Sequence, residues 1–230
     1  MNVTLITGGS SGIGAAAARL LLERGHRVAV TGRDRDRLDR FAESCGNPGT
    51  LLPLVADAAD PDAMRSVVDA TVERFGRLDA AVANAGFATP DSVVDGDPAR
   101  WRDMVLTNVL GPAVLIRSSV GALKATRGRI VLVGSVAGFI HTPGNLYGAT
   151  KWALTGLAEN TRRAVTADGI GVTLIAPGRV GTAFWDDLGG PPEGGTLTAD
   201  QVAESIAWAI GQPPGVDVNT VTIRPIGQPV

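Results

Sequence analysis

The chain has 230 residues, of which 44% are hydrophobic, so it is long enough to fold as one domain around a sizeable core. Its formal net charge of −2 and pI near 5.7 do not favour nucleic acid or an anionic membrane as a partner. One cysteine excludes an intrachain disulfide, and with only two histidines we expect no metal site. The N-terminal segment lacks the features of a signal peptide, and no apolar run approaches the roughly 20 residues that span a bilayer. We therefore expect a cytoplasmic protein.

Short apolar runs rich in β-branched residues alternate with helix-period segments along the chain. The predicted strands are Val3–Thr7, Arg27–Thr31, Leu51–Val55, Leu78–Ala83, Arg129–Ser135, Gly171–Ala176 and Val218–Arg224. The predicted helices are Gly12–Arg24, Asp34–Ser44, Asp60–Phe75, Pro98–Leu123, Leu146–Ala167 and Ala199–Ile210, the fourth long enough to contain a break. The strands are continuously apolar, which is typical of a parallel sheet covered by helices on both faces. The sequence therefore predicts a single α/β domain over residues 1–230, a doubly wound parallel sheet of about seven strands (a Rossmann fold).

In a doubly wound sheet, ligands bind beyond the carboxyl ends of the strands. Residues that follow successive strands should therefore lie together on one rim, although they are far apart in the sequence. These residues are Gly8, Arg33, Asp57, Asn84, Ser135 and Pro177. A functional site is expected along this rim.

The segment Thr7-Gly8-Gly9-Ser10-Ser11-Gly12-Ile13-Gly14 follows the first predicted strand and opens the first predicted helix. Glycines let a backbone approach a ligand closely, and free N–H groups at a helix start favour a phosphate. The spacing is G-x-x-x-G-x-G rather than the common G-x-G-x-x-G, so the segment could also be merely a turn. Its position between strand and helix favours phosphate binding. No Gly-Lys-Ser/Thr sequence follows, which disfavours nucleotide hydrolysis.

Tyr147, the only tyrosine, lies four residues before Lys151, one of two lysines among 21 basic residues. In a helix this spacing places both side chains on one face. An ammonium group beside a phenol would lower the pKa of the phenol from about 10, which makes it a usable proton donor and acceptor near neutral pH. A helix-face tyrosine with a solvated lysine has the same spacing, so this pair alone is a weak signal.

Six features in the right order make the chain resemble a short-chain dehydrogenase/reductase over nearly its whole length. They are the glycine turn at 7–14, Asn84-Ala85-Gly86, Asn108, Ser135, Tyr147-x-x-x-Lys151 and Pro177-Gly178. The resemblance implies that Tyr147 is the general acid in carbonyl reduction and the base in alcohol oxidation. It implies that Lys151 lowers the pKa of Tyr147 and binds the nicotinamide ribose, that Ser135 holds the substrate oxygen, and that Asn108 anchors a water in a proton relay. A strand-end cap at Ser135 and an ordinary helix polar residue at Asn108 are the alternatives.

The resemblance also implies a nicotinamide dinucleotide as cofactor. An NAD site usually has an acidic residue near the end of the second strand, where this chain has Gly32 followed by Arg33. Arg33 can pair with a 2′-phosphate, whereas Asp34 is expected to cap the next helix, so we predict NADP (NADPH) rather than NAD. The expected cofactor-binding residues are Gly8, Ser10, Ser11, Gly12, Ile13, Gly14, Arg33, Asp57, Asn84, Ala85, Gly86, Tyr147, Lys151, Pro177, Gly178, Val180 and Thr182.

The expected substrate is a small carbonyl compound or its secondary or primary alcohol, bound beside a loop near 179–198 in which Phe184 and Trp185 offer an apolar wall. Arg179 could meet a substrate carboxylate or be solvated, and His141 could line the mouth or be exposed. Members of this family usually associate through the long helices, so a homodimer or homotetramer is expected. A regulatory protein that binds NADP without turnover, and a related isomerase or epimerase, are the alternatives.

Overall fold

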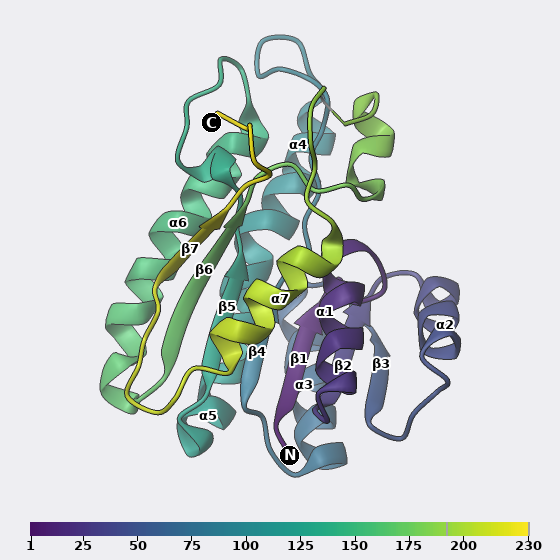
Figure 1. The fold of residues 1–230 in the computed structure, drawn as a ribbon, viewed down its shortest axis with the longest axis vertical. Helices are drawn as coiled ribbons and strands as arrows, with labels where there is room; N and C mark the ends of the chain where they lie inside the picture. Colours follow the sequence, from purple (N-terminus) through teal and green to yellow (C-terminus); the bar gives the residue numbers. More distant parts are fainter. Residues whose placement is uncertain (192, 230) are drawn as a thin grey trace.

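Seven parallel strands form one sheet in the computed structural model, which describes residues 1–191 and 193–229 (Figure 1). They are β1 (Val3–Thr7), β2 (Arg27–Gly32), β3 (Leu51–Val55), β4 (Ala80–Ala83), β5 (Arg129–Val133), β6 (Gly171–Pro177) and β7 (Thr220–Ile223). The strand order is β3-β2-β1-β4-β5-β6-β7, and Leu5 in β1 pairs with Ala29 on one side and Ala81 on the other. The chain order reverses between β1 and β4, which places the topological switch point there. The predicted Rossmann fold is confirmed.

Helices cover both faces of the sheet, and each layer encloses its own apolar core. On one face lie α1 (Gly12–Glu23), α2 (Arg35–Ser44) and α7 (Ala199–Ile210). On the other lie α3 (Pro61–Phe75), α4 (Pro98–Val105), α5 (Gly111–Thr126) and α6 (Leu146–Val165). The central strands β1, β4 and β6 are buried along their whole length. These strands are continuously apolar because both of their faces are buried, as the sequence predicted.

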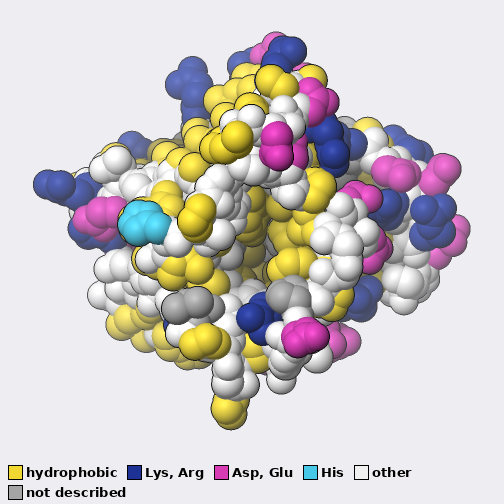
Figure 2. Space-filling model, turned by 90° about the horizontal axis from the view of Figure 1, so that it is seen from above, with side chains coloured by type: hydrophobic (Ala, Val, Ile, Leu, Met, Phe, Trp, Pro, Cys, Tyr) yellow, Lys and Arg dark blue, Asp and Glu magenta, His cyan; other side chains and the backbone are white. Residues whose placement is uncertain are grey.

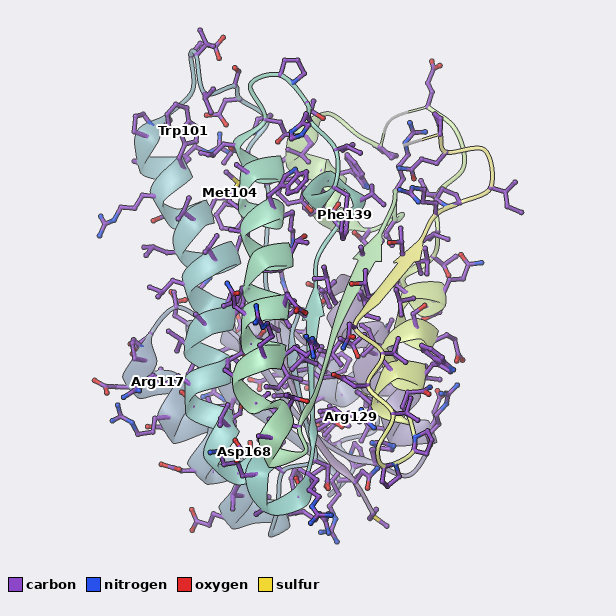
Figure 3. The ribbon with its side chains drawn as sticks, turned by 90° about the vertical axis from the view of Figure 1, so that its left-hand side faces the viewer. Trp101, Met104, Arg117, Arg129, Phe139 and Asp168 are labelled. Atoms are coloured by element: carbon purple, nitrogen blue, oxygen red, sulfur yellow. The ribbon has the colours of Figure 1, made fainter. Side chains whose placement is uncertain are left out.

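The long helical stretch predicted over residues 98–123 is interrupted by a π-helical turn at Leu106–Leu110, between α4 and α5. Figure 3 shows α4 and α5 as one column beside α6, with Trp101 and Arg117 on that column and Asp168 just past the end of α6. By length and mean hydropathy alone, Pro98–Thr126 could cross a membrane; in this fold α5 packs against α3 and α6. The cytoplasmic location stays a prediction.

Capping side chains decide where the helices begin. Asp60 accepts hydrogen bonds from the backbone N–H groups of Asp62 (2.9 Å) and Ala63 (3.1 Å), so α3 begins one residue later than predicted, at Pro61. Asp34 accepts from the N–H of Arg37 (3.0 Å) and caps α2, as predicted. β5 ends two residues earlier than predicted because Ser135 instead caps a 3₁₀ helix at Val136–Gly138.

Candidate active site

A cleft of about 1410 Å³ opens at the carboxyl ends of the strands. Figure 2 views the molecule from this end and shows a central hollow with hydrophobic side chains in its walls. All six residues predicted to share one rim line the cleft: Gly8, Arg33, Asp57, Asn84, Ser135 and Pro177. Pockets for drug-sized ligands usually have volumes of about 300–1,000 Å³, so this cleft has room for an extended ligand together with a second molecule.

The glycine turn between β1 and α1 presents backbone to the cleft. Gly8 (φ +65°) and Gly12 (φ +51°) occupy the left-handed region, which glycine adopts without strain. Ser11 is the N-cap of α1 but makes no side-chain hydrogen bond to the helix, and the first turn holds no acidic residue. The N-terminus of α1 is therefore open to an anion such as a phosphate.

Gly14 lies behind this turn rather than in the cleft wall. A Cβ on Gly14 would lie 2.5 Å from Asn84 Nδ2 and closer still to the carbonyl oxygen of Gly8. Its role is thus to let α1 pack against the turn, whereas the other predicted glycine-turn residues line the cleft: Gly8, Ser10, Ser11, Gly12 and Ile13. No side chain larger than hydrogen fits at position 14 without a shift of the backbone.

Asn84 ties the glycine turn to the end of β4. Its Nδ2 donates to the carbonyl oxygens of Thr7 (2.9 Å) and Gly8 (3.1 Å). The backbone N–H groups of Asn84 and Ala85 both donate to Thr7 Oγ1, at 3.1 and 3.2 Å. These bonds join β1 and β4 at the switch point, and Ala85 and Gly86 line the cleft beyond them.

Two arginines line the cleft beyond the end of β2. Arg33 and Arg37 are spaced four residues apart, and Ser10 faces the same end because its Oγ would lie 3.1 Å from a Cβ on Gly32. The carboxylate of Asp34 is held as the N-cap of α2. The sequence reasoning missed Arg37, although its place in the first turn of the helix that follows Arg33 was an available signal. Asp57 lines the neighbouring wall, where it accepts from the N–H of Ala59 (2.9 Å).

Ser135, Tyr147 and Lys151 meet in another part of the cleft wall. Tyr147 lies in the first turn of α6, which is capped by Asn145 through the N–H of Gly148 (2.9 Å). Lys151 Nζ lies 5.5 Å from the centre of the Tyr147 ring and donates to the carbonyl oxygen of Val133 (3.0 Å). Ser135 Oγ caps the short 3₁₀ helix and also interacts with the Tyr147 side chain. Ser135 therefore acts as a cap at the strand end and also contacts Tyr147.

Burial controls the protonation of Tyr147 and Lys151. It raises the pKa of Tyr147 to about 12, and the interaction with Ser135 opposes part of this shift. Burial also lowers the pKa of Lys151 to about 8. The prediction that the pKa of Tyr147 falls below 10 is wrong for this structure, because burial of the phenol raises it. The Lys151 ammonium is directed at the carbonyl oxygen of Val133. At neutral pH Tyr147 is a protonated phenol, and so a proton donor.

Asn108 lies behind the cleft, within the π-helical turn, and is 1% exposed. Its Nδ2 donates to the carbonyl oxygen of Phe87 (2.8 Å) and to Thr150 Oγ1 (3.1 Å), and its Oδ1 accepts from the N–H of Phe87 (3.0 Å). Thr150 Oγ1 in turn donates to the carbonyl oxygen of Tyr147 (2.7 Å). Asn108 and Thr150 therefore brace the first turn of α6. The sequence reasoning did not predict a role for Thr150, although its position directly before Lys151 was a possible signal.

The end of β6 and the segment after it form a further part of the cleft wall. Pro177, Gly178, Val180 and Thr182 line the cleft, and Thr182 Cγ2 would lie 3.6 Å from a Cβ on Gly12. Thr182 therefore lies beside the N-terminus of α1. The loop predicted near 179–198 includes position 192, which lies outside the described residues.

Arg179 and His141, whose roles the sequence left undecided, both make local contacts. Arg179 Nη1 donates to the carbonyl oxygen of Glu193 (2.5 Å), and its N–H donates to Gln228 Oε1 (2.9 Å). The His141 ring is exposed and stacks on Trp152, with ring centres 5.2 Å apart and planes inclined by 7°. It belongs to an outer surface rather than to the described cleft wall.

Comparison with known proteins identifies the family. Residues 2–190 match the family model for short chain dehydrogenases. An uncharacterized oxidoreductase of Staphylococcus epidermidis is 32% identical over 228 residues, which is 97% of each chain. The alcohol dehydrogenase from the archaeon Thermococcus sibiricus, solved with 5-hydroxy-NADP, is 27% identical with a TM-score of 0.89, covering 99% of this chain and 98% of that one. The closed form of a serine dehydrogenase with NADP+ is 26% identical with a TM-score of 0.90, over 98% and 96%. The chain belongs to the short-chain dehydrogenase family and is an oxidoreductase of that class.

Proposed function

We propose that this protein is an NADP-dependent oxidoreductase that interconverts a small carbonyl compound and its secondary or primary alcohol. The observation that carries the proposal is the arrangement of one cleft. The glycine turn with the open N-terminus of α1 lies at one part of it, and Ser135, Tyr147 and Lys151 lie together at another. Family membership supports the reaction class, and the protonated phenol of Tyr147 supports its chemistry.

The residues of the cleft fit a nicotinamide dinucleotide. The open N-terminus of α1 suits its pyrophosphate. Arg33 and Arg37 suit the 2′-phosphate of NADP, because guanidinium groups pair with phosphate bidentately and the nearby Asp34 is held as a helix cap. Two similar proteins have been solved with NADP+ or 5-hydroxy-NADP, which supports the same choice here.

The remaining predicted contacts follow the length of the cleft. Asp57 and the segment Asn84-Ala85-Gly86 would lie along the adenosine half. Lys151 would hold the nicotinamide ribose, and the nicotinamide end would lie beside Pro177, Gly178, Val180 and Thr182. The bound nicotinamide ring would supply or accept the hydride.

Tyr147 would transfer the proton, and Ser135 would help to hold the substrate oxygen. The substrate oxygen would lie between their hydroxyl groups, and Tyr147 would donate its proton to that oxygen as hydride is added to the carbonyl carbon. The alcohol and a Tyr147 phenolate result, and the Ser135 hydroxyl and the nearby Lys151 ammonium would stabilise the negative charge. Because the pKa of Tyr147 is about 12, the phenol is protonated at neutral pH and can act as this acid.

Fluorescence titrations with NADPH and with NADH, followed by turnover of small ketones and aldehydes, test the proposal. We expect tighter binding of NADPH than of NADH. The Tyr147→Phe variant should keep NADPH binding and lose turnover by about 10²–10⁴-fold. Near-normal turnover in this variant contradicts the role of Tyr147. Binding without any turnover by the unmodified protein favours the regulatory alternative, and no binding of either nucleotide defeats the cofactor assignment.

We further propose that the protein is a homodimer or homotetramer that associates through α4, α5 and α6. Val105, Leu110 and Trp152, on or beside these helices, expose large apolar side chains. A second copy of the chain would bury them, as symmetric interfaces do. Size-exclusion chromatography with light scattering measures the state directly, and a monomer at micromolar concentration contradicts the proposal.

A further inference from the structure

An aromatic wall, formed by Phe184 and Trp185, lies beside Tyr147 in the cleft. Both residues belong to the 3₁₀ helix Ala183–Leu188 that follows β6. The centre of the Phe184 ring is 5.6 Å from that of Tyr147, with the planes inclined by 56°. The Phe184 and Trp185 rings meet edge to face, at 5.2 Å and 85°. A carbonyl whose oxygen reaches the Tyr147 hydroxyl therefore has a substituent within contact distance of this wall.

Hydrogen bonds hold the aromatic wall in place. Trp185 Nε1 donates to the carbonyl oxygen of Val180 (2.7 Å), which fixes the plane of the indole. The N–H of Phe184 donates to Thr182 Oγ1 (3.3 Å), which fixes the start of the 3₁₀ helix. Because the wall is preformed, an apolar ligand group can pack against it with little loss of side-chain freedom.

The charged groups near the aromatic wall balance one another. Arg100 and Arg179 line this half of the cleft together with Asp91 and Asp187, so two cations accompany two anions outside the Tyr147–Lys151 pair. Arg179 already donates to a backbone carbonyl in the same loop. Apart from the Lys151 ammonium, the charges of these four residues therefore cancel.

Asp91, which also lines the cleft, disfavours a second anion there. Its Oδ2 accepts hydrogen bonds from Trp101 Nε1 (3.0 Å) and from the N–H of Asp97 (2.8 Å). Hydrogen bonds from Thr89 and the backbone of Asp97 hold the pKa of Asp91 at about 2, so it stays ionised. Apolar side chains also line the cleft here, and neutral polar ones lie among them: Phe87, Pro90, Ile140, Pro143 and Leu188, with Thr89, Ser92, Thr142 and Asn145.

We infer that the protein selects neutral ketones and aldehydes, and their alcohols, that carry an aryl group on the carbonyl carbon, and that Phe184 is the residue that selects them. The inference rests on the proposed function, since it places the substrate oxygen at Ser135 and Tyr147. An aryl group packs on Phe184 in an offset or edge-to-face arrangement. A carboxylate on the same ring would lose water, and the anions Asp91 and Asp187 that also line the cleft offset the cations Arg100 and Arg179, which disfavours its binding.

Three matched ketones test this selection in NADPH-dependent reduction. Acetophenone has the aryl group, 4-acetylbenzoate adds a carboxylate to the same ring, and butan-2-one has no ring. In the unmodified protein we expect kcat/KM for acetophenone to exceed the values for the other two by about 10- to 100-fold. Phe184→Ala should remove most of this preference, mainly by raising KM for acetophenone.

Phe139→Ala is the matched control, because Phe139 is 38% exposed and packs against Trp152 outside the described cleft wall. This variant should keep the preference for acetophenone. Tryptophan-fluorescence titration with 1-phenylethanol gives a second readout that does not depend on turnover. The dissociation constant of 1-phenylethanol should rise in Phe184→Ala and stay unchanged in Phe139→Ala.

Similar kcat/KM for the three ketones, or a preference for 4-acetylbenzoate, overturns the inference and leaves the oxidoreductase assignment intact. An unchanged preference in Phe184→Ala overturns the role of Phe184. Binding of 1-phenylethanol without reduction of any ketone would instead support the aryl selectivity of the cleft and defeat the proposed function. If the protein neither reduces these ketones nor binds 1-phenylethanol, both fail.

Discussion

Replacement of Lys151 by methionine should stabilise the fold at neutral pH while it removes the ammonium group from the cleft. The side chain is 6% exposed, and burial lowers its pKa from 10.5 to about 8. At about 1.36 kcal/mol for each pKa unit, holding the charged form in the fold costs about 3 kcal/mol. Loss of the hydrogen bond to Val133 offsets about 1 kcal/mol of the gain. The variant should therefore be more stable by about 2 kcal/mol at pH 7.

The stability difference between Lys151→Met and the unmodified protein should depend on pH. Between pH 8 and 10.5 the unfolded chain keeps a proton on Lys151 that the folded chain has released, so the stability of the unmodified protein rises with pH. Lys151→Met lacks this rise. Its advantage should be largest at pH 7 and smaller by about 2 kcal/mol at pH 9.5. Tyr147, whose pKa is about 12, does not release its proton in this range.

Urea unfolding at pH 7 and pH 9.5, followed by circular dichroism, measures both free energies of unfolding. Lys124→Met is the control, because Lys124 is the other lysine and its ammonium forms an exposed ion pair with Asp168 (2.9 Å). That variant should change stability by less than about 1 kcal/mol at either pH. A difference between Lys151→Met and the unmodified protein that is the same at both pH values refutes the reasoning, because it shows that the Lys151 charge carries no desolvation penalty.

Three further predictions concern the cofactor and the brace behind Tyr147. Gly14→Ala should weaken NADPH binding and lower stability by about 1–3 kcal/mol, because its Cβ would overlap Gly8 and Asn84; an unchanged dissociation constant and urea midpoint contradict this. Arg33→Asp should raise the NADPH dissociation constant and reduce the preference over NADH in fluorescence titrations. An unchanged ratio of the two constants would mean that Arg33 points away from the 2′-phosphate. Thr150→Val should lower kcat by about 5- to 10-fold with little change in NADPH binding, because it removes the hydrogen bond to the Tyr147 carbonyl. Thr150→Ser should restore kcat, and failure of this rescue argues against a positioning role.

Local patterns in the sequence determined the fold class and the position of the cleft. Continuous β-branched runs and 3.6-residue periodicity depend on neighbours in the chain, so they predicted the strands and helices to within three residues at their ends. The rule that parallel strands carry ligands at their carboxyl ends then placed Gly8, Arg33, Asn84 and Ser135 in one site without any contact being known.

The tertiary structure alone decided what those residues do to one another. The pKa of Tyr147 rises rather than falls because elements distant in the sequence bury the phenol and direct Lys151 toward Val133. Asn108 and Gly14 lie behind the cleft because each packs against segments that the sequence separates widely. Phe184 comes to lie beside Tyr147 for the same reason. Burial and long-range packing depend on the whole fold, so residue spacing could indicate which side chains carry the chemistry but not their protonation or their neighbours.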